Sequence, residues 1–507
     1  MTFKATYQSY RATGFFSGLV SDYVEGIDKL KEFYLHTPDE NGVQDAIRHR
    51  NFPEEDRRAL YEQWLAQYEG MNSHQIVTDN IRSILDKNTF TICTAHQPNI
   101  FTGPSYFIYK IIHAIRMAEE LNNKWKDFHF VPVYFMGSED ADLEELGIVN
   151  LAGEKYVWET SQKGAVGRML VDDAFIALLD KLKSGLSHLP FGASMFESIN
   201  RSYSIGKSIR QATFELVHDL FQEYGLLVFV PDSHASKKRC IPLFRKELTE
   251  GFSHQSLNDT VQKFPVEYKL QTPGREINLF YLEDGMRERI VKQANGFEVV
   301  NTTMKFTKEQ MLDCLQEKPE CFSPNVVLRP LMQELLLPNV VFIGGGSEIA
   351  YWLELGSVFK AAAIPFPVLV LRNSYLIIDA ATTKAIQNNK LQPSDFFLPE
   401  HELASLYLQK NGIDLNVLSG EMQALASLYA QIKVKASEAD ATLSDHVEAL
   451  QKNSMDKMQA LEKKMIRAEK RKNETALKRI SGIKNNIFPE GSLQERREGG
   501  LLFLSIY

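Results

Sequence analysis

The chain has 507 residues, of which 44% are hydrophobic and 24% charged, and it carries a net charge of −8. Such a composition is ordinary for globular proteins, and the length allows about three domain-sized units. The acidic total argues against a nucleic-acid partner, and the longest apolar run is too short to cross a bilayer. Four scattered cysteines without zinc-type spacing suit a reducing compartment, and the first residues lack a signal-peptide pattern. We therefore expect a cytoplasmic protein with neither nucleic acid nor membrane as a partner.

Helical spacing of apolar residues predicts helices over 17–34 and 54–87. Apolar strands then alternate with helices, such as those expected at 105–122 and 204–224. We expect these strands at 89–95, 129–137, 226–230, 338–344 and 366–371. Continuous apolar strands that alternate with helices are typical of a parallel sheet covered on both faces. The predicted fold class is therefore α/β, with a Rossmann-like, mostly parallel core.

Weaker strand and turn signals separate parts of this core. One segment predicts a hairpin around Asp284 and Gly285, because an Asp-Gly pair favours a tight turn. The final residues, GGLLFLSIY, resemble a strand. The predicted organisation is a core at 1–150, 201–245 and 323–382, insertions at 151–200 and 246–322, a helical arm at 383–490 and a C-terminal segment at 491–507.

The arm contains a long segment, 419–483, with no proline and only two glycines. Its charged positions surround an apolar stripe, which predicts a long helix or a helical hairpin with coiled-coil character. Ser454 interrupts this stripe. We expect a homodimer through the arm, and the alternative is a helix that packs on its own core. The stripe consists of Val447, Leu450, Met458, Leu461, Met465 and Ala468.

Small hydrogen-bonding residues follow the first predicted strand, in TAHQPNIFTGP. Ligands of open α/β sheets bind beyond the carboxyl ends of the strands, and helix N-termini there hold anions. This stretch is therefore a candidate site for a phosphate or a carboxylate. The alternative is that His96 and Asn99 only cap the turn. The candidate binding residues are Thr94, Gln97, Asn99, Thr102 and Gly103, with His96 as a candidate catalytic residue.

An acidic run, 138–145, follows the second strand. Closely spaced carboxylates need a cation nearby, such as Mg²⁺ or the ammonium group of an amino acid. Glu139 and Asp140 lie closest to the strand and are the candidate catalytic residues. The alternative is a solvated helix N-terminus that favours acidic residues. No HExxH or other zinc motif is present, so no residue is assigned as a protein metal ligand.

Polar residues also follow the other strands. Asp232 follows the third strand, Arg372 follows the last, and Arg329 and Gln333 precede the fourth. Arg329 could hold a carboxylate or a phosphate, or form a buried ion pair with Glu334. The turn after the fourth strand carries further candidate binding residues, which are Gly344, Gly345, Gly346 and Glu348.

Several blocks of the chain resemble the bacillithiol biosynthesis family of cysteine ligases. These blocks are HQPNIFTGPSYFIYKIIHAI, PVYFMGSEDADLEEL, GREINLFY and NVVLRPLMQELLLPNVVFIGGGSEIAYWLELGSVF. The resemblance covers about 90–150 and 200–372, and more loosely the arm. It implies a Rossmann-like core, a dimerising coiled coil and the amide linkage of L-cysteine to glucosaminyl-malate. Relatives often carry Gln at the position of His96 and His at that of Ala141.

The resemblance also implies a mechanism, because the family core is similar to class I aminoacyl-tRNA synthetases. ATP would activate the cysteine carboxylate at the α-phosphate, and the sugar amine would then attack the acyl-adenylate. His96 and the glycine turns would stabilise phosphate charge, Glu139 or Asp140 would hold the cysteine ammonium or Mg²⁺, and Arg329 or Arg372 the malate carboxylates. Two alternatives remain: a non-catalytic, nucleotide- or metabolite-binding dimer that supports another ligase, and a sugar-nucleotide glycosyltransferase.

Overall fold

The computed structural model describes residues 4–272 and 274–506. They form two compact units, one from the described parts of 16–375 and 495–507, the other from those of 1–15 and 376–494. Among the described helices, none is both long and apolar enough to cross a membrane.

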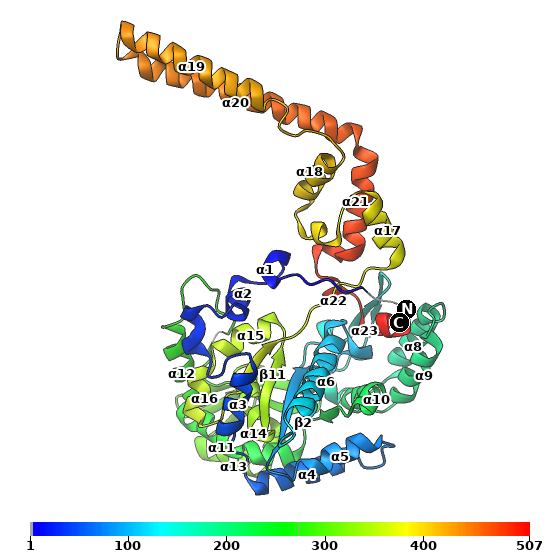
Figure 1. Cartoon of the computed structure of the whole chain (residues 1–507). Coiled ribbons are helices and arrows are strands. Elements are labelled where there is room, and N and C mark those ends of the chain that lie inside the picture. Colours follow the sequence, from blue (N-terminus) through cyan, green and yellow to red (C-terminus); the bar gives the residue numbers. More distant parts are fainter. Residues whose placement is uncertain (1–3, 273, 507) are drawn as a thin grey trace. The chain divides into compact units, whose positions relative to one another are not determined.

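A five-stranded parallel sheet forms the centre of the first unit (Figure 1). Its order is β5-β2-β1-β11-β12. The strands β2 and β5 therefore lie on one side of β1, and the later strands β11 and β12 lie on its other side. Strand order therefore reverses between β1 and β11. This confirms the predicted Rossmann-like α/β fold class. The strands are β1 (Thr89–His96), β2 (His129–Met136), β5 (Leu227–Phe229), β11 (Asn339–Gly344) and β12 (Val368–Leu371).

Alternating side chains of the central strands bury both faces of the sheet. On one face, Ile92 and Ile343 pack in a core with α3 (Glu40–His49) and α6 (Tyr106–Lys124). On the other face, Phe342 stacks on Trp352 of α15 (Gly346–Leu353), with ring centroids 4.3 Å apart. The neighbouring residues Phe342 and Ile343 of β11 thus pack on opposite faces of the sheet, because successive side chains of a strand point in opposite directions.

Three predicted helices are shorter than expected. The segment over 54–87 forms two helices, α4 and α5, the segment over 17–34 forms α2 and a 3₁₀ turn, and the helix expected over 204–224 is α10. Gly26 (φ 71°) and Gly70 (φ 75°) adopt left-handed backbone in these segments, which a continuous α-helix does not allow. The helices are α2 (Gly18–Val24), α4 (Glu54–Gln67), α5 (Gln75–Ser83) and α10 (Ile209–Phe221).

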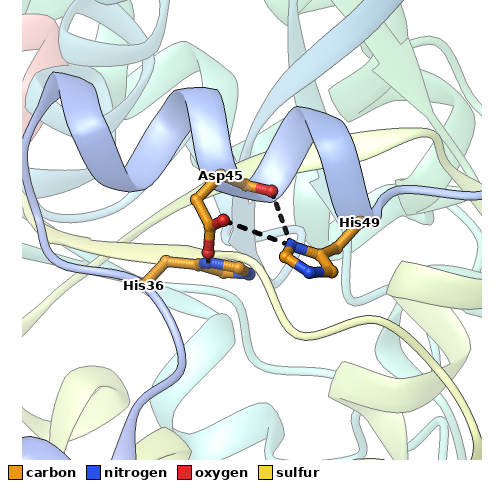
Figure 2. Close-up of side chains that lie close together, drawn as sticks. All are labelled: His36, Asp45 and His49. Carbon is orange, nitrogen blue, oxygen red and sulfur yellow. Dashed lines mark hydrogen bonds and ion pairs between the residues drawn. The ribbon is translucent and has the colours of Figure 1, made fainter.

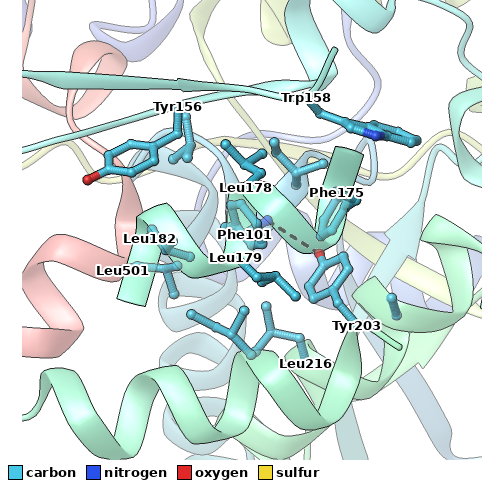
Figure 3. Close-up of a cluster of buried hydrophobic side chains, with 14 of the residues drawn as sticks. Phe101, Tyr156, Trp158, Phe175, Leu178, Leu179, Leu182, Tyr203, Leu216 and Leu501 are labelled. Atoms are coloured by element: carbon cyan, nitrogen blue, oxygen red, sulfur yellow. Dashed lines mark hydrogen bonds between the residues drawn. The ribbon is translucent and has the colours of Figure 1, made fainter. Parts of the chain in front are cut away.

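The first insertion is mainly helical, so the strand and turn prediction for it is largely wrong. A hairpin of β3 (Ile148–Leu151) and β4 (Glu154–Val157) precedes α8 (Asp173–Leu186) and α9 (Gly192–Ser202). Buried residues of α8 recur at helical spacing, which the turn-rich flanks obscured. They form a second hydrophobic core with the hairpin and α10 (Figure 3).

The second insertion forms an antiparallel sheet in the order β10-β6-β7-β8-β9. The predicted hairpin is confirmed, because Asp284 and Gly285 (φ 76°) connect β6 to β7. In the chain, α12 (Phe252–Val261) precedes these strands, and α13 (Lys308–Glu317) lies between β9 and β10. The strands are β6 (Leu279–Glu283), β7 (Met286–Gln293), β8 (Gly296–Val299), β9 (Lys305–Phe306) and β10 (Phe322–Pro324).

The strand-like prediction for the C-terminal residues is wrong, because they form the helix α23 (Gly500–Ile506). Leu501 and Leu502 are buried in the core of the first insertion, and Gly500 N–H donates to the Gly103 carbonyl at 3.0 Å. A short run that is apolar on all sides fits a buried helix as well as a strand, so its pattern alone cannot decide between them.

The second unit contains an antiparallel helical hairpin of α19 (Ser419–Ala439) and α20 (Leu443–Lys472) (Figure 1). Pairs along its length fix the register: Leu418 N–H donates to Glu462 at 3.2 Å, and the hydroxyls of Tyr429 and Ser454 lie 2.7 Å apart. The predicted coiled-coil arm is thus a hairpin within one chain. The helix α21 (Glu474–Ile487) follows.

The apolar stripe of α20 differs in part from the predicted one. Val447 is buried, and Met458, Met465 and Ala468 are half-buried, whereas Leu450 and Leu461 are 45% and 48% exposed. Ser454 belongs to the inner face because its hydroxyl pairs with Tyr429 of α19. The residue that seemed to interrupt the stripe is therefore part of the hairpin contact.

Candidate active site at the carboxyl ends of the parallel strands

A cavity of about 590 Å³ lies at the carboxyl ends of the central strands. Its lining includes the last residue of β1, His96, and residues that follow β2, β11 and β12, such as Ser138, Gly345 and Arg372. The reversal of strand order between β1 and β11 separates the connections that leave these strands, which is where open α/β sheets bind ligands.

The loop after β1 has an unusual backbone. Phe101 (φ 51°), Thr102 (φ 68°) and Gly103 (φ 59°) are consecutive residues with positive φ, a conformation that costs energy at the two non-glycine positions. The second hydrophobic core holds this loop, since Phe101 packs against Tyr203 and its N–H donates to the Tyr203 hydroxyl at 3.3 Å (Figure 3). The first insertion therefore fixes the loop that follows His96.

The His96 imidazole is the clearest candidate ligand contact. Its side chain packs against Tyr106 and Phe107 and is 8% exposed. Burial lowers its pKa well below the usual range, and the positive charges of Lys110 and Arg372 lower the pKa further, so the ring is neutral. His96 lines the cavity, and its buried Nε2 has no hydrogen-bond partner among the described residues. Buried polar atoms are normally paired, so a ligand in the cavity is a candidate partner for this atom.

Lys110 lies at the base of the cavity. Its buried Nζ donates to the Ala95 carbonyl at 2.7 Å and forms an ion pair with Glu348. Burial lowers the Lys110 pKa, which the Glu348 carboxylate partly offsets. Glu348 also accepts the Gly345 N–H at 2.8 Å, so it connects the lysine to the glycine turn at the start of α15.

The acidic run forms one side of the cavity with both of its candidate residues partnered. Glu139 forms an ion pair with the buried Lys237. Asp140 accepts from the Gln97 amide at 3.1 Å, and one of its oxygens lies 3.7 Å from Arg287. These contacts hold the two carboxylates at the rim, where an ammonium group would find acceptors.

Basic side chains outnumber acidic ones around the cavity. Arg329 donates to the Tyr351 hydroxyl at 2.7 Å and to Gln333 at 3.3 Å, and Arg372 donates to Glu495 at 2.6 Å. Such arrangements suit a ligand that carries both an ammonium group and several anionic groups. The basic lining residues are Lys110, Arg275, Arg287, Arg329, Arg372 and Arg496, and the acidic ones are Glu139, Asp140, Glu145 and Glu348.

The cavity brings together more than half of the predicted site residues. Those that line it are His96, Gln97, Glu139, Asp140, Arg329, Gly345, Gly346, Glu348 and Arg372. The others lie behind or beside this lining and support it. They are Thr94, Asn99, Thr102, Gly103, Asp232, Gln333 and Gly344.

Several supporting residues have identifiable structural partners. Thr94 donates to the Ile343 carbonyl at 2.8 Å across β1 and β11, and Asp232 is paired with Arg168 and Arg210. The alternative pairing of Arg329 with Glu334 does not occur. Glu334 instead forms a buried ion pair with Arg50 at 2.5 Å. Arg329 is thus held by neutral partners and faces the cavity.

The prediction missed lining residues from distant parts of the chain. Arg275 and Arg287 come from the second insertion, and Arg496 from the C-terminal segment. Only the fold brings them to this edge of the sheet. Lys110 carried a sequence signal, because it occupies the apolar face of α6 between the buried Phe107 and Ala114.

Family models match nearly the whole chain. Residues 3–373 match the N-terminal Rossmann-like domain of bacillithiol biosynthesis BshC, and residues 375–507 match its C-terminal coiled-coil domain. The chain belongs to the bacillithiol biosynthesis BshC family. The family resemblance seen in the sequence is thus confirmed.

Curated relatives agree with this assignment. The chain is 35% identical over 491 residues to a "Putative cysteine ligase BshC" of Flavobacterium johnsoniae, covering 96% of this chain and 92% of the relative. It is 36% identical to one of Christiangramia forsetii and 32% identical to one of Cytophaga hutchinsonii, both over 96% of this chain and 92% of the relative. The BshC relatives are therefore named as ligases that act with cysteine.

Proposed function

We propose that this protein joins L-cysteine to glucosaminyl-malate through an amide bond, with ATP as the source of carboxylate activation. The observation that carries the proposal is the buried Nε2 of His96, which has no hydrogen-bond partner among the described residues, at a cavity with six basic and four acidic lining residues. Cysteine brings an ammonium group, malate brings carboxylates and ATP brings phosphates. The mixed charge of the lining is complementary to this set.

Each side of the cavity is suited to one of these groups. Glu139 offers acceptors for the cysteine ammonium, and Arg329 offers donors for the malate carboxylates. Because its ring is neutral, His96 would act as a hydrogen-bonding group to a phosphate or carboxylate oxygen rather than as a cation. His96 would therefore position the phosphate or carboxylate group through a hydrogen bond without adding a positive charge to the site.

The glycine turn after β11 and its basic neighbours suit the phosphates of ATP. A Cβ atom at Gly345 would lie in ordinary van der Waals contact with Glu348 at 3.5 Å and Arg372 at 3.6 Å, so the turn lies directly beside these two charged groups. Lys110 and Arg372 would hold the phosphates, and Mg²⁺ would enter with them, since this ion usually binds through few protein ligands. In the activation step the cysteine carboxylate oxygen would bond to the α-phosphate as pyrophosphate leaves, and AMP would depart with that oxygen when the amide forms.

Amide formation requires the sugar ammonium group to lose protons as its nitrogen bonds to the cysteine carbonyl carbon. Asp140 is the candidate proton acceptor, because its hydrogen-bond donors are the neutral Gln97 amide and Ala141 N–H, and the charged Arg287 is more distant, at 3.7 Å. Glu139 is held in an ion pair by Lys237 and serves better for binding. This divides the roles of the two predicted carboxylates.

We also propose that the helical hairpin mediates a homodimer. Apolar side chains remain exposed on α19, including Leu428 (52%), Ile432 (40%) and Val434 (59%). Leu428 and Ile432 are four residues apart and lie on one face of α19; adjacent exposed apolar residues mark interaction surfaces, and a second hairpin would bury this face. The proposed reaction takes place in the cytoplasm, where ATP and cysteine are both present.

The test of this function uses the purified protein with ATP, Mg²⁺, cysteine and glucosaminyl-malate, and mass spectrometry of the thiol product. His96→Ala and Asp140→Asn should each lower the rate about 100-fold, as expected for loss of one preorganised polar group. His188→Ala, which changes an exposed histidine of the first insertion, should retain the rate. Full activity of both site variants would contradict the site assignment.

The same assay separates the ligase from the accessory alternative. A ligase forms product with the purified protein and consumes one ATP per product. A non-catalytic dimer forms product only when another enzyme is added, and this outcome would contradict the proposed activity while leaving ligand binding at the cavity intact.

A further inference from the structure

A cluster of His36, Asp45 and His49 lies outside the cavity described above (Figure 2). Within residues 4–272 and 274–506, it is the one group of at least three His, Cys, Asp or Glu side chains whose ligand atoms all lie within 4.8 Å of one another. Figure 2 shows the Asp45 carboxylate between the two imidazole rings. The proposed reaction uses none of these residues.

Local structure brings the three side chains together. Asp45 and His49 are four residues apart on α3, so they lie on one face of the helix. His36 precedes the helix, and its loop packs closely on α3: a Cβ atom at Gly42 would lie only 1.9 Å from the Thr37 carbonyl oxygen. The glycine therefore permits the approach that places His36 beside Asp45.

The opposite face of α3 holds the cluster on a rigid support. Val43 and Ala46 are buried against the central sheet, and Arg50 at the helix end pairs with Glu334. Glu334 also accepts from Asn339, the first residue of β11, at 2.8 Å. The C-terminal end of α3 thus lies at the amino end of β11, whereas the cavity lies at the carboxyl ends.

The distances in the cluster suit a transition-metal ion. Nδ1 of His36 lies 2.8 Å from one Asp45 oxygen, and Nδ1 of His49 lies 3.4 Å from the other. Two ligands at about 2.0–2.1 Å from a tetrahedral ion are about 3.3 Å apart. Small side-chain shifts would therefore convert the hydrogen-bonded arrangement into a metal-bound one. His49 Nδ1 would exchange its 2.9 Å contact with the Asp45 carbonyl for the ion.

The charge and burial of the cluster also fit. His36 is 5% exposed, so the surrounding residues hold its imidazole in place beside Asp45. The Asp45 carboxylate offsets one charge of a divalent ion. Arg50 is the nearby cation, and Glu334 neutralises it. His49 is 66% exposed, so water can reach the remaining position.

We propose that His36, Asp45 and His49 form a binding site for one divalent transition-metal ion, of which Zn²⁺ is the best match to two imidazoles and a carboxylate. The site is separate from the proposed catalytic cavity. It would connect the loop before α3 to the helix and stabilise the sheet edge that α3 covers.

The test uses the full chain without a histidine tag, stripped with a chelator and dialysed against Zn²⁺ alone. The wild type should retain one more equivalent of zinc than His49→Ala or Asp45→Asn. A matched control is His401→Ala, because His401 is 77% exposed and lies 3.8 Å from Glu402, and the part of the chain that the structure describes places no third ligand there. This variant should retain the wild-type amount.

A second measurement reports geometry rather than amount. Co²⁺ alone should give the visible absorption of a tetrahedral site in the wild type and in His401→Ala, and lose it in His49→Ala. Equal zinc retention and equal Co²⁺ spectra in the wild type and His49→Ala would overturn the proposal. The circular dichroism spectrum of His49→Ala should match that of the wild type, because His49 is exposed. A loss of metal from this variant would then not reflect unfolding.

Discussion

His113 shows how burial tunes a single side chain. Its Nδ1 accepts the Asn373 N–H at 3.2 Å, and burial, together with the charge of Arg372, lowers its pKa to about 4. In the unfolded chain a histidine titrates near about 6.5. Below that pH the unfolded state binds a proton that the folded state does not, so stability is complete above this pH and is lost as the pH falls.

We therefore predict that His113→Asn flattens the pH dependence of stability. Between pH 7.5 and 5.5, the wild type should lose about 1 kcal/mol more of its unfolding free energy than the variant, because Asn cannot titrate. Urea unfolding at several pH values measures this difference. His188→Gln, an exposed substitution, serves as the control. Parallel curves for the wild type and His113→Asn would contradict the prediction.

The sequence predicted cavity-lining residues where their position next to a strand was enough to place them. His96, Glu139, Asp140 and Arg372 directly follow predicted strands, and all line the cavity. It missed Lys110, because a lysine on an apolar helix face was not taken as a buried partner. It also assigned no metal ligands, since His36 comes from a loop whose approach to α3 depends on Gly42.

At the scale of elements, a buried ion pair joins α3 to α14 (Leu328–Leu336). The side chains of Arg50 and Glu334 are 2% and 0% exposed, and the Asn339 amide donates a further hydrogen bond to Glu334. Removing one partner of a buried pair leaves an uncompensated charge, which costs about 3–5 kcal/mol. This connection supports the sheet from the side opposite the cavity.

We predict that Arg50→Met lowers the unfolding free energy by about 3–5 kcal/mol and that adding Glu334→Gln recovers part of this loss. Chemical denaturation measures both variants. Lys124→Met provides the comparison, because its pair with Glu40 is more than half exposed and should contribute less than about 1 kcal/mol. Equal effects of Arg50→Met and Lys124→Met would contradict the account.

Strands and helices of the core were predictable because long apolar runs with period signals define them. The errors occurred where these signals are short or interrupted: α8 and α9 in the first insertion, and α23 at the C-terminal end. The seven residues of α23, which are mostly apolar, do not by themselves distinguish a helix from a strand. Only contacts with Phe101 and the rest of that core decide it.

At the scale of the molecule, the exposed apolar face of α19 leads to the prediction of a homodimer. Leu428→Lys with Ile432→Lys places two charges on this face and should convert the dimer to a monomer. Light scattering with size-exclusion chromatography measures the mass. The control Gln431→Lys adds a charge at an exposed neighbouring position and should leave the mass unchanged. A monomeric wild type would contradict the prediction.

The position of the cavity could be predicted in outline but not in detail. Placement at the carboxyl ends of parallel strands follows from the fold class, but the reversal between β1 and β11 required the strand order. Arg287 and Arg496 reach the cavity from segments that are far apart in sequence. No local sequence pattern indicates that such distant segments meet. The sequence therefore predicts fewer basic residues around the cavity than the structure contains.

The most direct test of the account is thiol profiling of cells that lack this gene, by fluorescent labelling and mass spectrometry of thiols and their amine precursors. The account predicts that bacillithiol disappears and glucosaminyl-malate accumulates. Wild-type and His188→Ala copies should restore the thiol, and a His96→Ala copy should not. Unchanged bacillithiol in cells without the gene would contradict the proposed cysteine-adding role.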